Sequence, residues 1–354
     1  PAVTTLGHPA GVPYQVTLNG NQTYHLSAVS PADLSGTTIV SSRPFVVYGG
    51  HSCALVPDPT ITACDTIVDQ MQPSQAWGFE FVTLPFARRT AGDVIRVYAQ
   101  SNGTTVSVNG VQVATLNQGA FFETSRTTAA RIVTNQAAMV AQYSKGCRAE
   151  GLINPCYGDP MLLTVVPTSQ WAARFDAVIP ALAVGYEHYL GIVAPTSAIG
   201  QVRINGQAVP AGSFTAIPGT PYSGANVLRS PGLQRVTSTQ PMAVSVYGFR
   251  EFEGYGYTAA MAVDGEGADA NDVIVRYNAD GSRDAQFGDQ GVVLIDHAVA
   301  FGSSLPSVDR ARRAIVDDGA IIVGGVSINA STEQRVFASY RLEGGQLFKD
   351  GFED

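Results

Sequence analysis

Charged side chains are scarce in this sequence, and their scarcity limits the partners it can have. Only 14% of the 354 residues are Asp, Glu, Lys or Arg, against about 25% in an average soluble domain. The net charge is −8, whereas nucleic-acid binding requires clustered Lys and Arg. We therefore expect no nucleic acid as partner and no attraction to an anionic membrane surface.

Long apolar runs and helical periodicity are also missing. No apolar run reaches the roughly 18–20 residues that a membrane-spanning helix needs, so we expect no membrane insertion. Apolar residues still make up 45% of the chain, which is enough to build folded cores. The 37 Gly and 20 Pro, together with abundant Val and Thr, are typical of short strands joined by tight turns.

Cysteine is limited to four residues in two local pairs, Cys53 with Cys64 and Cys147 with Cys156. Neither pair has the Cys-x-x-Cys spacing or the nearby His ligands of a metal site, so we predict no metal and no cofactor. Each pair brackets a loop rich in Pro, Asn, Asp and Gly, which favours two short-loop disulfides over free buried thiols. Disulfides indicate an oxidising compartment, so we expect a secreted protein at an extracellular surface.

Three segments of the chain share one order of signals. Each begins with a strand that ends in Asn-Gly, the strongest short signal for a hairpin, at residues 16–20, 106–110 and 202–206. Each closes with a second strand pair that ends near residues 49, 143 and 248. The copies start about 90–95 residues apart, which suits one small β-sandwich per copy.

We therefore predict an all-β protein of tandem Ig-like β-sandwich repeats with a small C-terminal β unit. The expected domains are repeat 1 (1–75), repeat 2 (76–170), repeat 3 (171–262) and the C-terminal unit (263–354). The first repeat has almost no lead-in strand before its hairpin, because the strand is missing or trimmed. An edge left open in this way invites pairing with another chain.

Several segments, taken in order, resemble the IgGFc-binding protein N-terminal domain family over about residues 20–260. The segments that carry the resemblance are residues 43–51, 77–82, 92–97, 104–110 and 157–160, with the flanking cysteines. The resemblance implies an extracellular β-rich module of the kind found in bacterial surface proteins and animal mucus proteins. The family name implies immunoglobulin Fc binding, a ligand that we do not transfer to this chain.

The C-terminal region is similar to the delta-60 repeat family of bacterial extracellular proteins. Residues 276–282, Asp284, Phe287 and Gly288 fit the repeat unit, and residues 336–345 are an eroded second copy. The alternating oxygens from Asn278 to Asp284 resemble a calcium loop, but Asp stands where the loop requires a later Glu. We interpret this stretch as an Asp-Gly turn.

Candidate catalytic groups do not form a recognisable arrangement. The five His residues are scattered, and no Gly-x-Ser-x-Gly sequence occurs. These residues are His8, His25, His51, His188 and His297. Glu80 and Asp93 lie on expected strands without an acid/base partner. Residues 158–161 resemble the Gly-Asp-Pro-His site of self-cleaving mucin-type domains, but Met161 replaces the His. We therefore expect no enzyme.

Four aromatic residues lie in a Gly-rich stretch after the third repeat: Phe249, Phe252, Tyr255 and Tyr257. They either form a contact for a protein or glycan or pack between the third sandwich and the C-terminal unit. Two functions remain open. The first is a structural subunit of a bacterial extracellular fibre or surface assembly that forms a homopolymer through β-strand-mediated self-association. The alternative is a monomeric adhesion module that binds a host protein or glycan.

Overall fold

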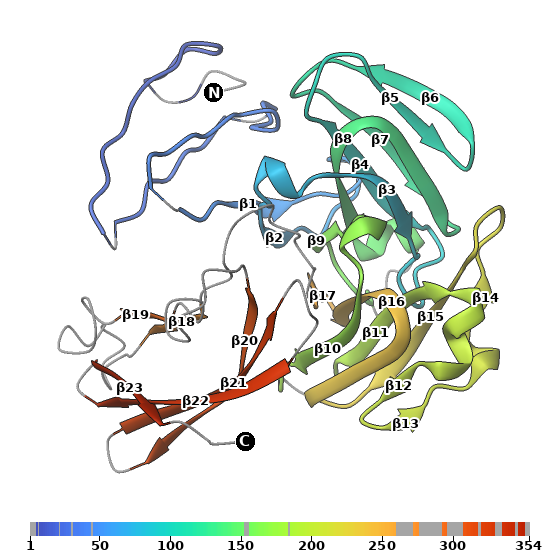
Figure 1. Cartoon of the computed structure of the whole chain (residues 1–354). Helices are drawn as coiled ribbons and strands as arrows, with labels where there is room; N and C mark the ends of the chain where they lie inside the picture. Colours follow the sequence, from blue (N-terminus) through green and yellow to red (C-terminus); the bar gives the residue numbers. More distant parts are fainter. Residues whose placement is uncertain are drawn as a thin grey trace. The chain divides into compact units, whose positions relative to one another are not determined.

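The computed structural model describes Thr5 and residues 7–20, 22–29, 31–43, 45–151, 156–182 and 185–259, and further along the backbone of six strands between residues 272 and 350. All regular structure in these residues is β, apart from short 3-10 helices, so the all-β prediction is confirmed. The chain divides into two compact units, Pro1–Asp264 and Gly265–Asp354 (Figure 1). Each unit is described by itself.

The first paired strands form a hairpin, β1 (Tyr48–Ala54) with β2 (Asp65–Gln70). Two carboxylates of β2 hold this hairpin against later parts of the same unit. The Asp69 carboxylate accepts a hydrogen bond from the Thr164 amide at 2.7 Å, and Asp65 accepts one from the Gly254 amide at 3.4 Å. The hairpin is therefore attached to both of the larger sheets.

In the described part of the region expected to form the first repeat, this hairpin is the only pair of strands. The structure describes no strand in residues 7–47 apart from isolated bridge positions. Asn19 and Gly20 lack the positive φ angles that a type I′ hairpin turn needs. Because no strand covers them, Val16, Leu18 and Val40 are exposed. A sandwich in residues 1–75 stays a prediction.

The first large sheet has seven strands in the order β6-β5-β8-β4-β7, and β3 and β9 also pair with β8. Its strands are β3 (Gly78–Thr83), β4 (Asp93–Ala99), β5 (Thr104–Val108), β6 (Val111–Leu116), β7 (Phe121–Arg126), β8 (Ala130–Ser144) and β9 (Leu162–Val165).

The second large sheet has eight strands in the order β13-β12-β16-β11-β15-β14, and β10 and β17 also pair with β16. Its strands are β10 (Ala172–Ile179), β11 (Glu187–Pro195), β12 (Arg203–Ile204), β13 (Gln207–Ala208), β14 (Thr215–Ala216), β15 (Tyr222–Arg229), β16 (Gly232–Arg250) and β17 (Glu253–Thr258). Apart from β14, the order repeats that of the first sheet strand for strand.

The same local features recur at matching places in the two sheets. Asn109-Gly110 and Asn205-Gly206 both adopt positive φ at the tips of hairpins β5–β6 and β12–β13. Short 3-10 helices precede β3 and β10, and each ends at a Trp, Trp77 or Trp171. The 3-10 helices in the described residues are η1 (Ser74–Ala76), η2 (Cys147–Glu150), η3 (Thr168–Gln170), η4 (Thr196–Gln201) and η5 (Ala211–Ser213).

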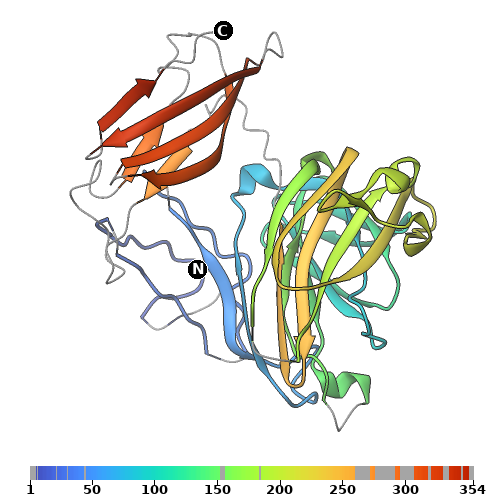
Figure 2. The same cartoon turned by 90° about the horizontal axis from the view of Figure 1, so that it is seen from below.

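One long strand in each sheet bends so that its two halves pair with different neighbours. The first part of β16 pairs with β10 and β12, and the second part pairs with β11 and β17. The register shifts over residues 238–241, where Pro241 has no amide to donate. Figures 1 and 2 show β16 as a long curved strand. The bend folds each sheet over a core, centred on Phe81 and Ile95 in the first and on Phe175 and Ile192 in the second.

The second unit contains two antiparallel sheets, β18-β19 and β20-β21-β22-β23. Its strands are β18 (Asp272–Val275), β19 (Val292–Ile295), β20 (Ser307–Asp317), β21 (Ala320–Asn329), β22 (Arg335–Glu343) and β23 (Gln346–Asp350). Residues 276–291, which carry the delta-60-like motif and the calcium-loop-like stretch, lie outside the described residues.

Candidate protein-binding site

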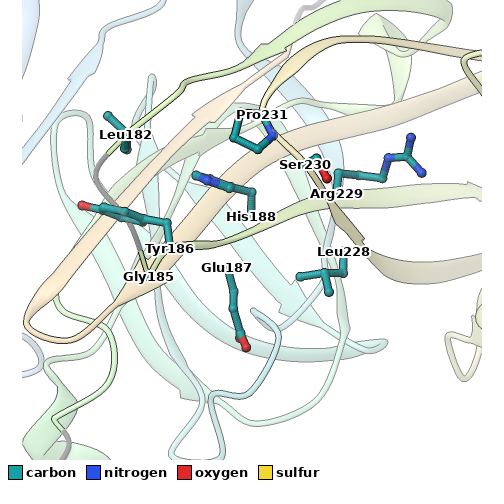
Figure 3. A pocket seen from close by; sticks show the side chains of 9 residues that line it. All are labelled: Leu182, Gly185, Tyr186, Glu187, His188, Leu228, Arg229, Ser230 and Pro231. Atoms are coloured by element: carbon teal, nitrogen blue, oxygen red, sulfur yellow. The ribbon is translucent and has the colours of Figure 1, made fainter.

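A pocket opens where β11 begins and the β15–β16 hairpin turns (Figure 3). Its volume is about 510 Å³. The lining residues are Leu182, Gly185, Tyr186, Glu187, His188, Leu228, Arg229, Ser230 and Pro231. Strand pairing brings the two segments together, because His188 lies opposite Arg229 in the β11–β15 register.

The turn that forms one wall requires a glycine. Ser230 and Pro231 connect β15 to β16, and the chain enters β16 at Gly232 with φ of +117°. Residues with a Cβ rarely adopt this conformation. The turn therefore has a fixed shape, and it places the Pro231 ring at the pocket.

The floor of the pocket is a buried imidazole. His188 is buried, and its Nδ1 lies 2.7 Å from the Tyr255 hydroxyl. A Cβ at position 248 would lie 2.5 Å from Tyr255 Cε1, so Gly248 leaves the room that this pair needs. Burial lowers the pKa of His188 below its usual value, so the ring is neutral at pH 7.

Tyr186 covers the His188 ring and is itself fixed on its outer side. The two rings are stacked, with centroids 5.7 Å apart and planes 12° apart. The Tyr186 hydroxyl donates to Glu253 at 3.2 Å, and the Arg250 guanidinium lies 5.1 Å from the Tyr186 ring centroid. Contacts from β16 and β17 thus hold the aromatic floor in one orientation.

The rim of the pocket exposes large apolar side chains. Leu182 is 44% exposed and Leu228 is 60% exposed. Val178 on β10 and Leu233 on β16 lie directly opposite each other near the same hairpin, and each is 57% exposed. Exposed apolar groups gathered around a hollow are typical of a surface that binds another molecule.

Glu187 also lines the pocket, but its carboxylate is engaged elsewhere. Figure 3 shows it directed away from the His188 ring. It accepts hydrogen bonds from the Tyr157 hydroxyl at 2.6 Å, the Arg88 guanidinium at 2.6 Å and the Tyr189 hydroxyl at 3.0 Å. These donors, Tyr157 first, lower the pKa of Glu187 and keep it ionised. The carboxylate joins segments next to the first sheet to the second sheet, and its hydrogen bonds to these donors leave it no free role at the pocket.

A comparison of the sequence with known protein families gives a match over most of the chain. A family model described as IgGFc binding protein matches residues 1–248. The chain belongs to the IgGFc binding protein family. The human IgGFc-binding protein is 27% identical over 263 residues, which cover 71% of this chain and 5% of that protein. This chain therefore corresponds to a small part of that relative, and no solved structure matches it.

The resemblance found in the sequence is confirmed for this family, and the delta-60-like region stays a prediction. The pocket lies within the matched residues. The structure pairs Cys53 with Cys64 and Cys147 with Cys156, so none of the four cysteines is free. Two disulfides in a member of this family fit a secreted, extracellular protein.

The four aromatic residues proposed as a partner contact have different environments. Tyr255 supports the pocket floor through His188. The Tyr257 hydroxyl accepts a hydrogen bond from the Val178 amide at 3.2 Å and donates one to the Val178 carbonyl. Both side chains are partly buried against the core of the second sheet. Neither forms a free surface patch.

Phe249 requires a correction, because it cannot contact a partner. Its ring is fully buried in the core of the first sheet, where it packs edge-to-face on Phe86 at 6.1 Å. Phe252 is 46% exposed at the β16–β17 turn with φ of +53°. Its amide donates to the Cys156 carbonyl at 2.9 Å, which fixes this turn beside the second disulfide.

The residues considered for catalysis or metal binding have structural partners. His51 Nδ1 accepts a hydrogen bond from the Cys53 amide, and Glu80 pairs with Arg131 at 2.8 Å. Asp93 is buried and accepts from the Phe86 amide. In the described residues no three His, Cys, Asp or Glu gather as metal ligands. Nor does any described helix have the length and hydropathy that crossing a membrane requires.

Sequence reasoning missed the pocket. Its residues come from two segments about 40 positions apart that only the β11–β15 register joins. One signal was present, since two polar residues, Glu187 and His188, begin the strand directly before its apolar run at residues 189–194. Polar residues on a buried strand indicate a partner or a site.

Proposed function

We propose that this chain is an extracellular protein-binding module and that the pocket around His188 is the centre of its binding surface. Family membership and the two disulfides support an extracellular binding role. The observation that carries the proposal is the exposed pair Leu182 and Leu228 over a rigid aromatic floor. Burying solvent-exposed leucine side chains against a partner is favourable and therefore stabilises the complex.

The proposed partner is a protein. The His188 ring is uncharged, and the rim combines the apolar Leu182, Leu228 and Pro231 with the polar Arg229 and Ser230. A mixed apolar and polar rim of this kind is typical of a protein contact. The relative is named for binding the Fc region of IgG, so the Fc fragment of human IgG is the first probe. A glycan is the alternative ligand class, since sugars stack on rings such as Tyr186.

A matched pair of substitutions tests the surface. Leu228→Asp places a negative charge at the rim of the pocket. Val111→Asp places the same charge on β6 of the first sheet, at a similarly exposed position that does not line the pocket. Binding of the Fc fragment to the immobilised chain is measured for both variants. We expect Leu228→Asp to weaken binding at least tenfold, about 1.4 kcal/mol, and Val111→Asp to leave it unchanged. Equal effects of the two variants would remove the pocket from the proposal.

Self-association is the second candidate function, in which the chain is a subunit of an extracellular fibre or surface assembly. One observation favours it. Among the strands that the structure describes, β10 pairs only with β16, so one of its edges has no strand partner. An open edge can pair with another chain. Light scattering over a range of concentrations tests this candidate, and a monomer throughout would exclude it. A bacterial origin stays a prediction.

A further inference from the structure

The open edge of β10 indicates which strand forms the contact between two copies of the chain. This inference rests on self-association, the second candidate function. Two hydrogen bonds show which backbone groups face that edge. The Val178 amide and carbonyl both bond to the Tyr257 hydroxyl, so they point away from β16. Backbone groups along a strand alternate in direction with a period of two residues. The amides and carbonyls of Arg174 and Asp176 therefore also point to the open edge.

The side chains at these two positions have opposite charge and are exposed. Arg174 lies 3.6 Å from Asp176 on the outer face of β10, and Arg235 of β16 lies 2.7 Å from the same carboxylate. The hydrogen bond from Arg235 lowers the pKa of Asp176, so the carboxylate is ionised at neutral pH. Phe175 and Ala177, between and beyond them, are buried on the opposite face.

We propose that β10 pairs antiparallel with β10 of a second copy of this chain, about a two-fold axis at Phe175. In this register Arg174 lies opposite the partner's Asp176, and Asp176 lies opposite the partner's Arg174. Both are hydrogen-bonded pairs, and each exchanges two backbone bonds. Opposite charges directly across an antiparallel pair stabilise it.

Neighbouring registers are excluded by charge and by side-chain direction. A shift of two residues one way places Asp176 opposite the partner's Asp176. The same shift the other way places Arg174 opposite the partner's Arg174, and like charges across a pair are destabilising. A shift of one residue would place residues whose backbone amides and carbonyls face the open edge opposite residues whose amides and carbonyls face β16. Such pairs cannot exchange backbone hydrogen bonds. Among these registers, only the one centred on Phe175 satisfies both conditions.

The contact closes on itself. A two-fold interface uses the same edge on both copies, so it produces a dimer and leaves no second β10 edge for growth. This edge alone therefore does not build a fibre. The Val178 groups are already bonded to Tyr257, which limits the new ladder to residues 173–177 and predicts a weak, concentration-dependent dimer.

Cysteine cross-linking tests the register directly, because all four native cysteines are in disulfides. Arg174→Cys and Asp176→Cys are made as separate full-length variants and oxidised alone and mixed. We expect a cross-linked dimer in the mixture and none with either variant alone, since identical positions lie diagonally, beyond disulfide reach. Intact mass under non-reducing conditions gives the readout. A cross-link in one variant alone, or none in the mixture, would overturn the inference.

Charge substitutions give a second readout that needs no cross-link. Asp176→Arg is expected to weaken the dimer on the order of tenfold in light scattering, and the double swap Arg174→Asp, Asp176→Arg to restore it. Glu80→Arg on β3, also in an ion pair, is the control and should leave the dimer unchanged. If the chain self-associates but the mixture forms no cross-link, the β10 contact is refuted and self-association is not. If the chain stays monomeric, both the β10 contact and self-association are refuted. Fc binding, measured separately, is independent of both outcomes.

Discussion

The Tyr255 hydroxyl lies 2.7 Å from Nδ1 of the buried His188, and this contact joins β17 to the floor of the pocket. The link connects one of the aromatic residues singled out in the sequence to a site that the sequence did not reveal. It also makes the floor rigid, since the imidazole cannot rotate without losing its partner. A rigid floor lowers the entropy cost of binding.

Tyr255→Phe removes this hydrogen bond and leaves the imidazole nitrogen without a partner. We expect the free energy of unfolding to fall by about 1–3 kcal/mol, because a buried polar atom left unsatisfied is costly. Urea unfolding measures the change. Tyr24→Phe, at an exposed tyrosine, serves as control, and an equal loss there would contradict the role assigned to Tyr255.

Phe249→Ala and Phe252→Ala separate a core aromatic from an exposed one. The first removes a fully buried ring, and we expect a loss of about 3–5 kcal/mol in the free energy of unfolding. The second removes a half-exposed ring, and we expect less than about 1 kcal/mol. Thermal or urea unfolding of both variants decides. A stability loss that is larger for Phe252→Ala would reverse the assignment.

Asp93 predicts a pH dependence of stability. Burial raises the pKa of Asp93 to about 7 in the folded chain, from its ordinary 3.8. Between these values the folded state keeps a proton that the unfolded state releases, so Asp93 adds stability as the pH falls from 8 to 5. In Asp93→Asn the difference in unfolding free energy between pH 8 and pH 5 should change by at least about 1.4 kcal/mol, the equivalent of one pKa unit.

His188 acts in the opposite direction over part of this range. Its folded pKa lies below the ordinary 6.5, so the unfolded state protonates first as the pH falls, and the folded state loses relative stability. Because His188 is present in both proteins, its contribution cancels in the comparison. Identical pH profiles for wild type and Asp93→Asn would contradict the assignment to Asp93.

The second disulfide provides a further test. Cys147 and Cys156 are both buried and lie 9 positions apart. Replacing both by Ser frees this loop in the unfolded chain, and we expect a loss of about 2–3 kcal/mol in the free energy of unfolding. Guanidinium unfolding under non-reducing conditions measures it. A variant as stable as wild type would contradict a stabilising role for this disulfide.

Local signals in the sequence were sufficient for much of the fold. Asn109-Gly110 and Asn205-Gly206 form hairpin tips because both positions adopt positive φ. Asn19-Gly20 has the same letters but no paired strands in the described residues, because a hairpin also needs neighbours that bury its apolar face. Turn chemistry is therefore reliable only where a sheet is present to receive the strands.

The environment of the aromatic residues was beyond sequence reasoning. Phe249 and Phe252 are three positions apart, yet one is fully buried and the other is exposed at a turn. The β16–β17 register and the bridge between Tyr157 and Glu251 decide this difference. Neither pairing can be predicted from the composition or the periodicity of the sequence. The pocket was missed for the same reason.

Hydrogen–deuterium exchange of the chain with and without the Fc fragment of human IgG tests the central claim most directly. If the pocket is the binding surface, amide exchange slows in the segments around residues 185–189 and 227–233 and stays unchanged in β6, which serves as the internal reference. Binding that protects other segments and leaves these two unchanged would contradict the account.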